Sequence, residues 1–231
     1  MAEIFHRAFF LDGPAGKLEA MLWTSPLAHP PRAAVVCHPH PLFGGTMHNK
    51  VVFQTAKALH HLGLPVLRFN FRGAGLSEGT HDNGIGEQDD VHAALDDLAR
   101  EFPQTPLLLA GFSFGSRVGL KVGCEDQRVG ELIGVGLPTD NVLDSLDRHF
   151  LHHCQKPKLI VQGSQDEFAS LKSIEALFAA MPEPKKLVIV DGADHFLKGK
   201  LDQLGAAIDS WLAPRLFPPA LSPAPSPCPQ K

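Results

Sequence analysis

Short apolar runs recur along this chain, and segments with helical periodicity separate them. The runs are apolar at nearly every position, so we expect strands that are buried on both faces. They span residues 33–37, 66–70, 107–110, 132–137, 158–162 and 186–190. The intervening segments repeat their apolar residues every three or four positions, as amphipathic helices do; they span residues 50–62, 87–101, 171–181 and 197–212. This alternation predicts a parallel sheet with helices on both faces.

The ends of the chain differ from this pattern. Residues 5–11 and 17–23 flank a turn-rich link, which suits an antiparallel hairpin before the first buried strand. Residues 216–231 are rich in proline, which lacks the backbone donor of a helix or sheet interior. We therefore predict one α/β domain over residues 1–215 and a disordered tail over residues 216–231.

Composition excludes several classes of partner. Lys and Arg number 21 against 25 Asp and Glu, a net charge of -4, so no basic surplus is available for nucleic acid. No apolar run is long enough to span a membrane. The first residues carry charges and resemble no secretion signal. We expect a soluble, cytoplasmic protein that binds neither nucleic acid nor membranes.

Cysteine and histidine usage indicates no metal and no cofactor. Four cysteines are widely spaced without a C-x-x-C pair, and we expect them to be reduced, structural thiols: Cys37, Cys124, Cys154 and Cys228. Thirteen histidines raise the question of a metal site, but none follows the H-E-x-x-H pattern. The candidates weighed for a metal are His38, His40, His48 and the pairs His60–His61 and His152–His153.

The pentapeptide Gly111-Phe-Ser-Phe-Gly115 follows the run 107–110 directly, and a helix-compatible segment follows it. Strand, turn and helix are the context that a G-x-S-x-G nucleophile elbow requires. Small residues two positions before and after the serine let the strand and the helix approach closely. Ser113 is therefore the predicted nucleophile.

A serine hydroxyl needs a histidine base, and the base needs a carboxylate to orient it. In this strand order the acid and then the histidine follow the serine, each after a later strand. Asp166 and His195 occupy those two places, after the runs 158–162 and 186–190. Asp140 stays open as the alternative acid, whereas Asp194 adjoins the histidine and would point away from it.

Two backbone donors are expected for the oxyanion, one after the nucleophile and one on the loop after an earlier strand. Phe114 supplies the first. On the loop after residues 33–37, Pro39 and Pro41 lack an N–H, which leaves His40 between them. The alternative is that His38 and His40 only pack this loop.

A glycine-rich segment at residues 70–79 superficially resembles a dinucleotide loop. Its third glycine is one place late and no helix is expected to open there, so we predict a structural loop without NAD. Gly84 and Gly86 then precede an expected helix start, where Glu87 and Asp90 suit the helix dipole.

These motifs together resemble a family of small bacterial α/β-hydrolases related to the dienelactone hydrolases. The resemblance covers most of residues 5–213 and rests on residues 38–47, 69–77, 84–87 with Asp90, 111–115, Asp166 and 192–195. It implies a mostly parallel sheet of about eight strands and a triad of Ser113, Asp166 and His195. Dienelactone hydrolases proper have a cysteine where Ser113 stands, so their lactone substrate does not carry over. About twenty residues separate residues 137 and 158, too few for a large cap domain.

The function that this sequence predicts is hydrolysis of small carboxylic esters through an acyl-enzyme, without a cofactor. A thioesterase or peptidase could use the same triad. A third alternative is a binding protein that keeps the fold without catalysis.

Overall fold

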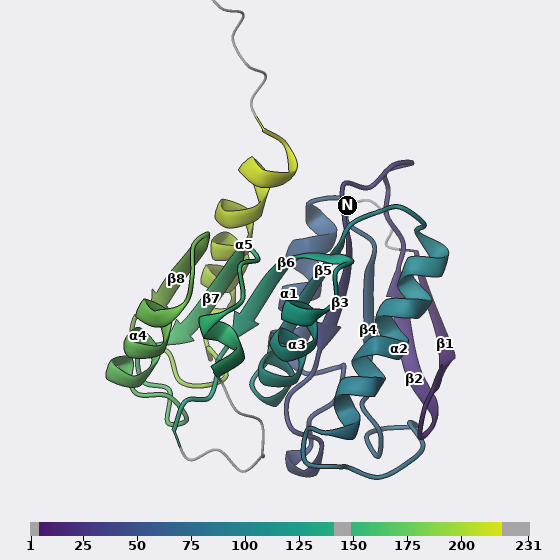
Figure 1. Ribbon diagram of the computed structural model, residues 1–231, viewed down its shortest axis with the longest axis horizontal. Coiled ribbons are helices and arrows are strands. Elements are labelled where there is room, and N and C mark those ends of the chain that lie inside the picture. Colours follow the sequence, from purple (N-terminus) through teal and green to yellow (C-terminus); the bar gives the residue numbers. More distant parts are fainter. Residues whose placement is uncertain (1–4, 141–148, 219–231) are drawn as a thin grey trace, which may run out of the picture.

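The computed structural model describes residues 5–140 and 149–218. Its centre is an eight-stranded sheet in the order β1-β2-β4-β3-β5-β6-β7-β8 (Figure 1). The strands are β1 His6–Gly13, β2 Gly16–Trp23, β3 Ala33–Cys37, β4 Val66–Phe69, β5 Leu107–Phe112, β6 Val129–Val135, β7 Lys158–Gly163 and β8 Lys185–Val190. Strand β2 is antiparallel to both β1 and β4, and the pairs from β4 to β8 are parallel. The predicted hairpin and mostly parallel sheet are confirmed.

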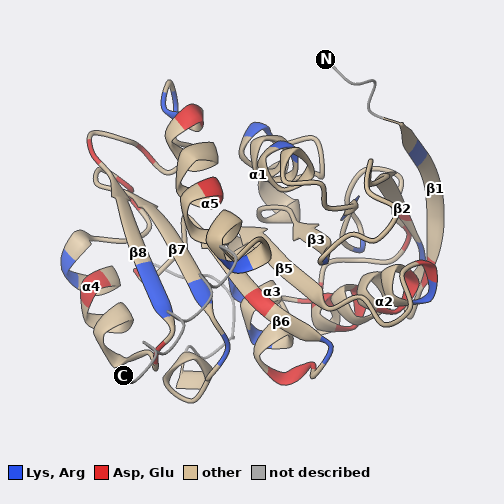
Figure 2. Ribbon diagram, turned by 90° about the horizontal axis from the view of Figure 1, so that it is seen from above, with Lys and Arg blue, Asp and Glu red and all other residues tan. Residues whose placement is uncertain are grey.

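In the described residues, five helices cover the two faces of the sheet. They are α1 Lys50–His61, α2 Gly86–Glu101, α3 Phe114–Glu125, α4 Leu171–Ala180 and α5 Leu201–Leu216, with short 3-10 turns η1 Pro41–Phe43 and η2 His149–His152. Apolar side chains of α1 and α5 share one core cluster, and those of α2, α3 and α4 share the other. Figure 2 shows α1 and α5 on one side of β3 and β5, with α2 and α3 on the other. The described residues contain no cap domain.

The last helix differs from its prediction at both ends. Residues 197–200 form turns, and α5 begins at Leu201 and continues to Leu216, so the tail predicted from residue 216 begins inside a helix. At the C-terminal end the helix is held by a buried carboxylate on β6: Glu131 accepts hydrogen bonds from Trp211 Nε1 at 2.7 Å and from Arg215 Nε at 3.1 Å. These bonds fasten the final turns to the sheet. The rest of the predicted tail, residues 219–231, lies outside the described residues.

The expectation of reduced cysteines is wrong for one pair. Cys124, near the end of α3, and Cys154, after η2, form a disulfide across a sequence separation of 30 residues. Only the fold brings these residues together, so no local spacing could indicate the pair. Cys37 is free and buried in β3, and Cys228 lies outside the described residues.

No helix in the described parts of the chain is long and apolar enough to cross a membrane. The same residues contain no group of three or more His, Cys, Asp or Glu side chains placed to hold a metal ion.

Candidate active site

The predicted nucleophile lies on a strained turn between β5 and α3. Ser113 has φ 57° and ψ -122°, a left-handed conformation that costs a non-glycine residue about 1–3 kcal/mol. A Cβ at Gly111 would lie 2.2 Å from the carbonyl oxygen of Gly115, and a Cβ at Gly115 would lie 2.3 Å from that of His38. Both glycines are therefore required by close backbone approach. The turn presents the serine side chain at the carboxyl edge of the sheet.

Three side chains meet at this edge. The Oγ of Ser113 lies 2.9 Å from Nε2 of His195, and Nδ1 of the same ring lies 2.8 Å from Oδ2 of Asp166. The carboxylate fixes the tautomer, because Nδ1 must carry the proton that it donates to Asp166. Nε2 is then the nitrogen that accepts the Ser113 proton. The structure thus brings together the three residues that the sequence predicted as nucleophile, base and acid.

The Asp166 carboxylate is fully buried and held from two further directions. Gln162 Nε2 donates to Oδ2 at 2.5 Å, and the backbone N–H of Phe168 donates to Oδ1 at 2.8 Å. Sequence reasoning missed Gln162. The available signal was a polar residue inside the otherwise apolar run at the end of β7. These bonds compensate the burial of the carboxylate and fix its orientation toward the imidazole.

The alternative acids are occupied elsewhere. Asp140 Oδ2 accepts a hydrogen bond from the N–H of Ser170, the residue that caps α4. Asp194 Oδ1 accepts one from the N–H of Lys198. The structure therefore places Asp166, and neither of these two, against the imidazole.

The imidazole of His195 lies in an aromatic setting that sequence reasoning did not foresee. Its centroid is 4.6 Å from that of Phe168, 4.9 Å from Phe112 and 5.4 Å from Phe196. Gly136, just after β6, has φ 53°, and a Cβ there would lie 3.2 Å from Cε1 of His195. The three phenylalanine rings therefore restrict the position of the His195 imidazole, and the lack of a side chain at Gly136 leaves space for it.

The loop after β3 is fixed by a buried neutral histidine. His38 Nε2 accepts a hydrogen bond from the N–H of Phe71 at 2.9 Å, so the proton is on Nδ1, which donates to the carbonyl oxygen of Pro39 at 2.6 Å. Burial lowers the pKa of His38 to about 3. This imidazole therefore packs and fastens the loop.

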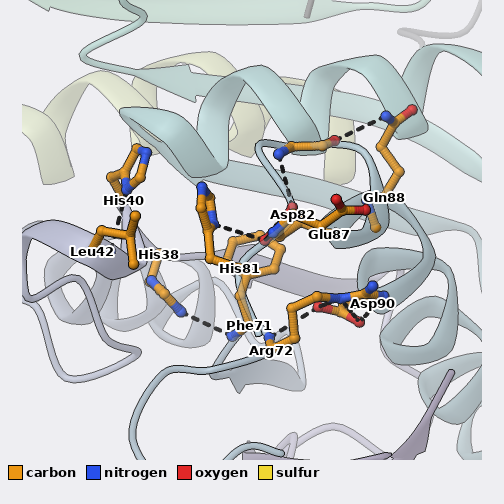
Figure 3. Close-up of polar contacts among 12 residues, drawn as sticks. His38, His40, Leu42, Phe71, Arg72, His81, Asp82, Glu87, Gln88 and Asp90 are labelled. Atoms are coloured by element: carbon orange, nitrogen blue, oxygen red, sulfur yellow. Dashed lines mark hydrogen bonds and ion pairs between the residues drawn. The ribbon is translucent and has the colours of Figure 1, made fainter. Parts of the chain in front are cut away.

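His40 and Phe114, predicted as oxyanion donors through their backbone N–H groups, lie side by side. Their ring centroids are 4.9 Å apart. The His40 imidazole caps η1, because its Nδ1 accepts a hydrogen bond from the N–H of Leu42 (Figure 3). Phe114 opens α3, where the helix dipole favours a negative charge. The loop after β3 and the start of α3, which carry the two predicted donors, are therefore in contact.

The segment 70–79 is a loop, as predicted, and no helix begins within it. Arg72 in this loop is bound to Asp90 of α2 through its N–H and its guanidinium, the shortest distance being 2.7 Å. The predicted helix start is also confirmed, one residue earlier than expected, at Gly86.

Comparison with known proteins agrees with this geometry. Residues 33–211 match the family model described as an alpha/beta hydrolase domain, and the chain belongs to this family.

Three relatives show in more detail which proteins this chain resembles. It is 40% identical to an alpha-beta serine hydrolase homologue of Coxiella burnetii, with a TM-score of 0.82 and coverage of 89% of this chain and 97% of that one. It is 35% identical to a serine hydrolase without a lid from Xanthomonas campestris, with a TM-score of 0.80 and coverage of 95% and 100%. An uncharacterized protein of Rickettsia prowazekii is 34% identical over 209 residues, which are 88% of this chain and 87% of that one. The resemblance to small serine hydrolases without a lid is confirmed, and the link to dienelactone hydrolases stays a prediction.

Proposed function

We propose that this protein is a serine hydrolase that cleaves small carboxylic esters through an acyl-enzyme. The observation that carries the proposal is the 2.9 Å contact between Ser113 Oγ and His195 Nε2, with Asp166 behind the ring. The relative from Xanthomonas campestris is described as a serine hydrolase without a lid, which supports the same class of chemistry here.

In the proposed reaction, Ser113 Oγ attacks the ester carbonyl carbon while its proton moves to His195 Nε2. The C–O bond to the alcohol then breaks, and the alcohol leaves with that proton. Water attacks the acyl-enzyme next and gives one proton to His195. The carboxylic acid leaves as the C–O bond to Ser113 breaks, and the proton returns to Ser113. Atoms balance with one water consumed and no redox step.

Backbone donors stabilise the negative charge of each tetrahedral intermediate in this scheme. The N–H groups of Phe114 and His40 take this role in the proposal, since Phe114 opens a helix and the two residues are in contact. Asp166 stabilises the imidazolium that forms when His195 accepts a proton.

Exposed apolar side chains near the site favour small, uncharged acyl groups. Leu42 and Phe43 of η1 are 70% and 72% exposed, directly beside His40, and Phe196 next to His195 is 51% exposed. Such residues offer an apolar surface to an acyl chain.

The test is hydrolysis of p-nitrophenyl acetate and butyrate by wild-type protein and by Ser113→Ala. We expect the substitution to lower kcat at least about a thousandfold, because the nucleophile is gone. Ser210→Ala, an exposed serine on α5, is the matched control and should leave turnover unchanged. Undiminished turnover in folded Ser113→Ala would overturn the proposal.

A further inference from the structure

The first turn of α2 carries a buried carboxylate that the triad does not use. The Glu87 side chain has no exposed surface. One of its oxygens accepts a hydrogen bond from the N–H of Asp82, and the other accepts one from the N–H of Gly84, both at 2.8 Å (Figure 3). The carboxylate therefore closes the loop that leads into the helix.

The same carboxylate contacts a histidine that faces the active site. His81 Nδ1 lies 2.8 Å from Oε1 of Glu87, and only 5% of the His81 side chain is exposed. The contact is short enough for an ion pair, although its direction does not meet the geometry of a hydrogen bond. On its other side, the centroid of the His81 ring lies 4.6 Å from that of the His40 ring and 5.5 Å from that of the Phe114 ring.

The base of this arrangement is rigid. Asp90, one turn further along α2, holds the backbone and the guanidinium of Arg72. A Cβ at Gly86 would lie 2.0 Å from Nη1 of Arg72, so helix and loop are packed without spare room. The His81 ring lies between the Glu87 carboxylate on the helix side and the rings of His40 and Phe114, against which it packs.

We infer that His81, held by Glu87, is a positioning residue that sets the place of the two oxyanion donors on His40 and Phe114. The inference rests on the proposed function. Oxyanion donors act only at 2.7–3.1 Å from the developing charge, and misplacement of a catalytic group by about 1 Å costs on the order of 100-fold in rate. Two backbone N–H groups compensate the burial of the Glu87 carboxylate and fix its position, so the oxygen that contacts His81 is held in place.

The test compares an aryl ester with its thionoester analogue, in which sulfur replaces the carbonyl oxygen. The anion that develops on sulfur is larger and accepts weaker hydrogen bonds, so its formation depends less on the donors. A loss of donor geometry must slow the oxygen ester more than the thionoester. A loss of folded protein slows both equally.

We expect His81→Ala to lower kcat for the oxygen ester about 30-fold, with little change in KM, and to lower the preference for oxygen over sulfur about tenfold. His81→Phe keeps a ring against His40 and should recover most of both quantities. For Glu87→Gln we expect kcat and the oxygen preference to lie between the values of His81→Ala and His81→Phe.

Two substitutions on α2 away from the site serve as controls. His92→Ala removes a histidine that is 46% exposed and lies 3.6 Å from the Asp126 carboxylate, and Glu101→Gln alters an acid paired with Arg7. Neither should change turnover or the oxygen preference. Titration with a fluorophosphonate counts competent sites, so each kcat refers to folded protein.

An oxygen preference that stays at its wild-type value in His81→Ala and Glu87→Gln, whatever the loss of total activity, would overturn the inference. If His81→Ala does not fold, His81→Phe and Glu87→Gln decide by the same ratio. A wild-type protein that hydrolyses neither ester would overturn the proposed function and the inference together. If the wild type is active and its preference for the oxygen ester over the thionoester is unchanged in the variants, the inference alone is overturned.

Discussion

The buried histidine behind the oxyanion loop predicts a specific loss of stability in acid. His38 has no exposed surface, and burial lowers its pKa from 6.5 to about 3. In the unfolded chain the same imidazole takes up a proton below about pH 6.5. Between pH 6.5 and 3 the unfolded state therefore binds one more proton than the folded state. The free energy of unfolding must fall as the pH falls through this window.

The magnitude follows from the two pKa values. Each pH unit well inside the window is worth about 1.4 kcal/mol, so the whole interval amounts to on the order of 5 kcal/mol. Between pH 6.5 and 4.5 alone, the loss due to His38 is about 2.5 kcal/mol. This is a large part of the 5–15 kcal/mol that typically stabilises a domain.

Urea unfolding at pH 4.5, 5.5, 6.5 and 7.5 measures this loss when wild type is compared with His38→Gln. Glutamine does not titrate, and its amide offers an acceptor for the Phe71 N–H and a donor for the Pro39 carbonyl. The difference between the two proteins cancels every other titrating group. We expect the wild type to lose about 2.5 kcal/mol more than the variant between pH 6.5 and 4.5. Parallel stability curves would refute the reasoning.

Three further predictions concern the elbow, the acid and the disulfide. Gly115→Ala should lower the free energy of unfolding by about 3 kcal/mol or more, because its Cβ would clash with a backbone carbonyl. Gly119→Ala should raise it by about 0.5–1 kcal/mol, because no atom lies closer than 3.5 Å to the added Cβ. Thermal unfolding measures both changes. Asp166→Asn should lower kcat for p-nitrophenyl esters on the order of 10⁴-fold by removing the tautomer control. Reducing the bond between Cys124 and Cys154, which are 30 residues apart, should lower the free energy of unfolding by about 3.5 kcal/mol; urea unfolding with and without reductant measures it.

Each of these three predictions has an outcome that would contradict it. Equal effects of alanine at Gly115 and Gly119 would show that close approach to the backbone after β3 is not what constrains the start of α3. Asp140→Asn is the control for the acid, and a larger loss of kcat there than in Asp166→Asn would reassign that role. Mass spectrometry that finds free thiols in native, unreduced protein would contradict the disulfide.

The elements could be predicted because buried strands and amphipathic helices leave local signals. The run 158–162 and the acid that follows it are close in sequence, and parallel strands bring their carboxyl ends to one edge. Asp166 and His195 could therefore be named as partners before any distance was known. Their contact itself depends on loop conformations, and the sequence offered Asp140 as well.

Contacts between loops leave no local sequence pattern from which they could be predicted. Gln162 was visible only as a polar residue in an apolar strand, and its bond to Asp166 depends on side-chain geometry. His81 and Glu87 lie six residues apart across a loop of no regular period. The disulfide joins the end of α3 to a segment 30 residues later. In each case tertiary packing, rather than local pattern, decides which groups meet.

The nucleophile is tested most directly by covalent labelling with a fluorophosphonate, followed by peptide mapping. The proposal predicts one label per chain, on the peptide that contains Ser113, and loss of esterase activity in proportion to labelling. His195→Gln should label far more slowly, because the serine has lost its base. Full activity in labelled protein, or a label on another residue of the folded chain, would contradict the proposed function.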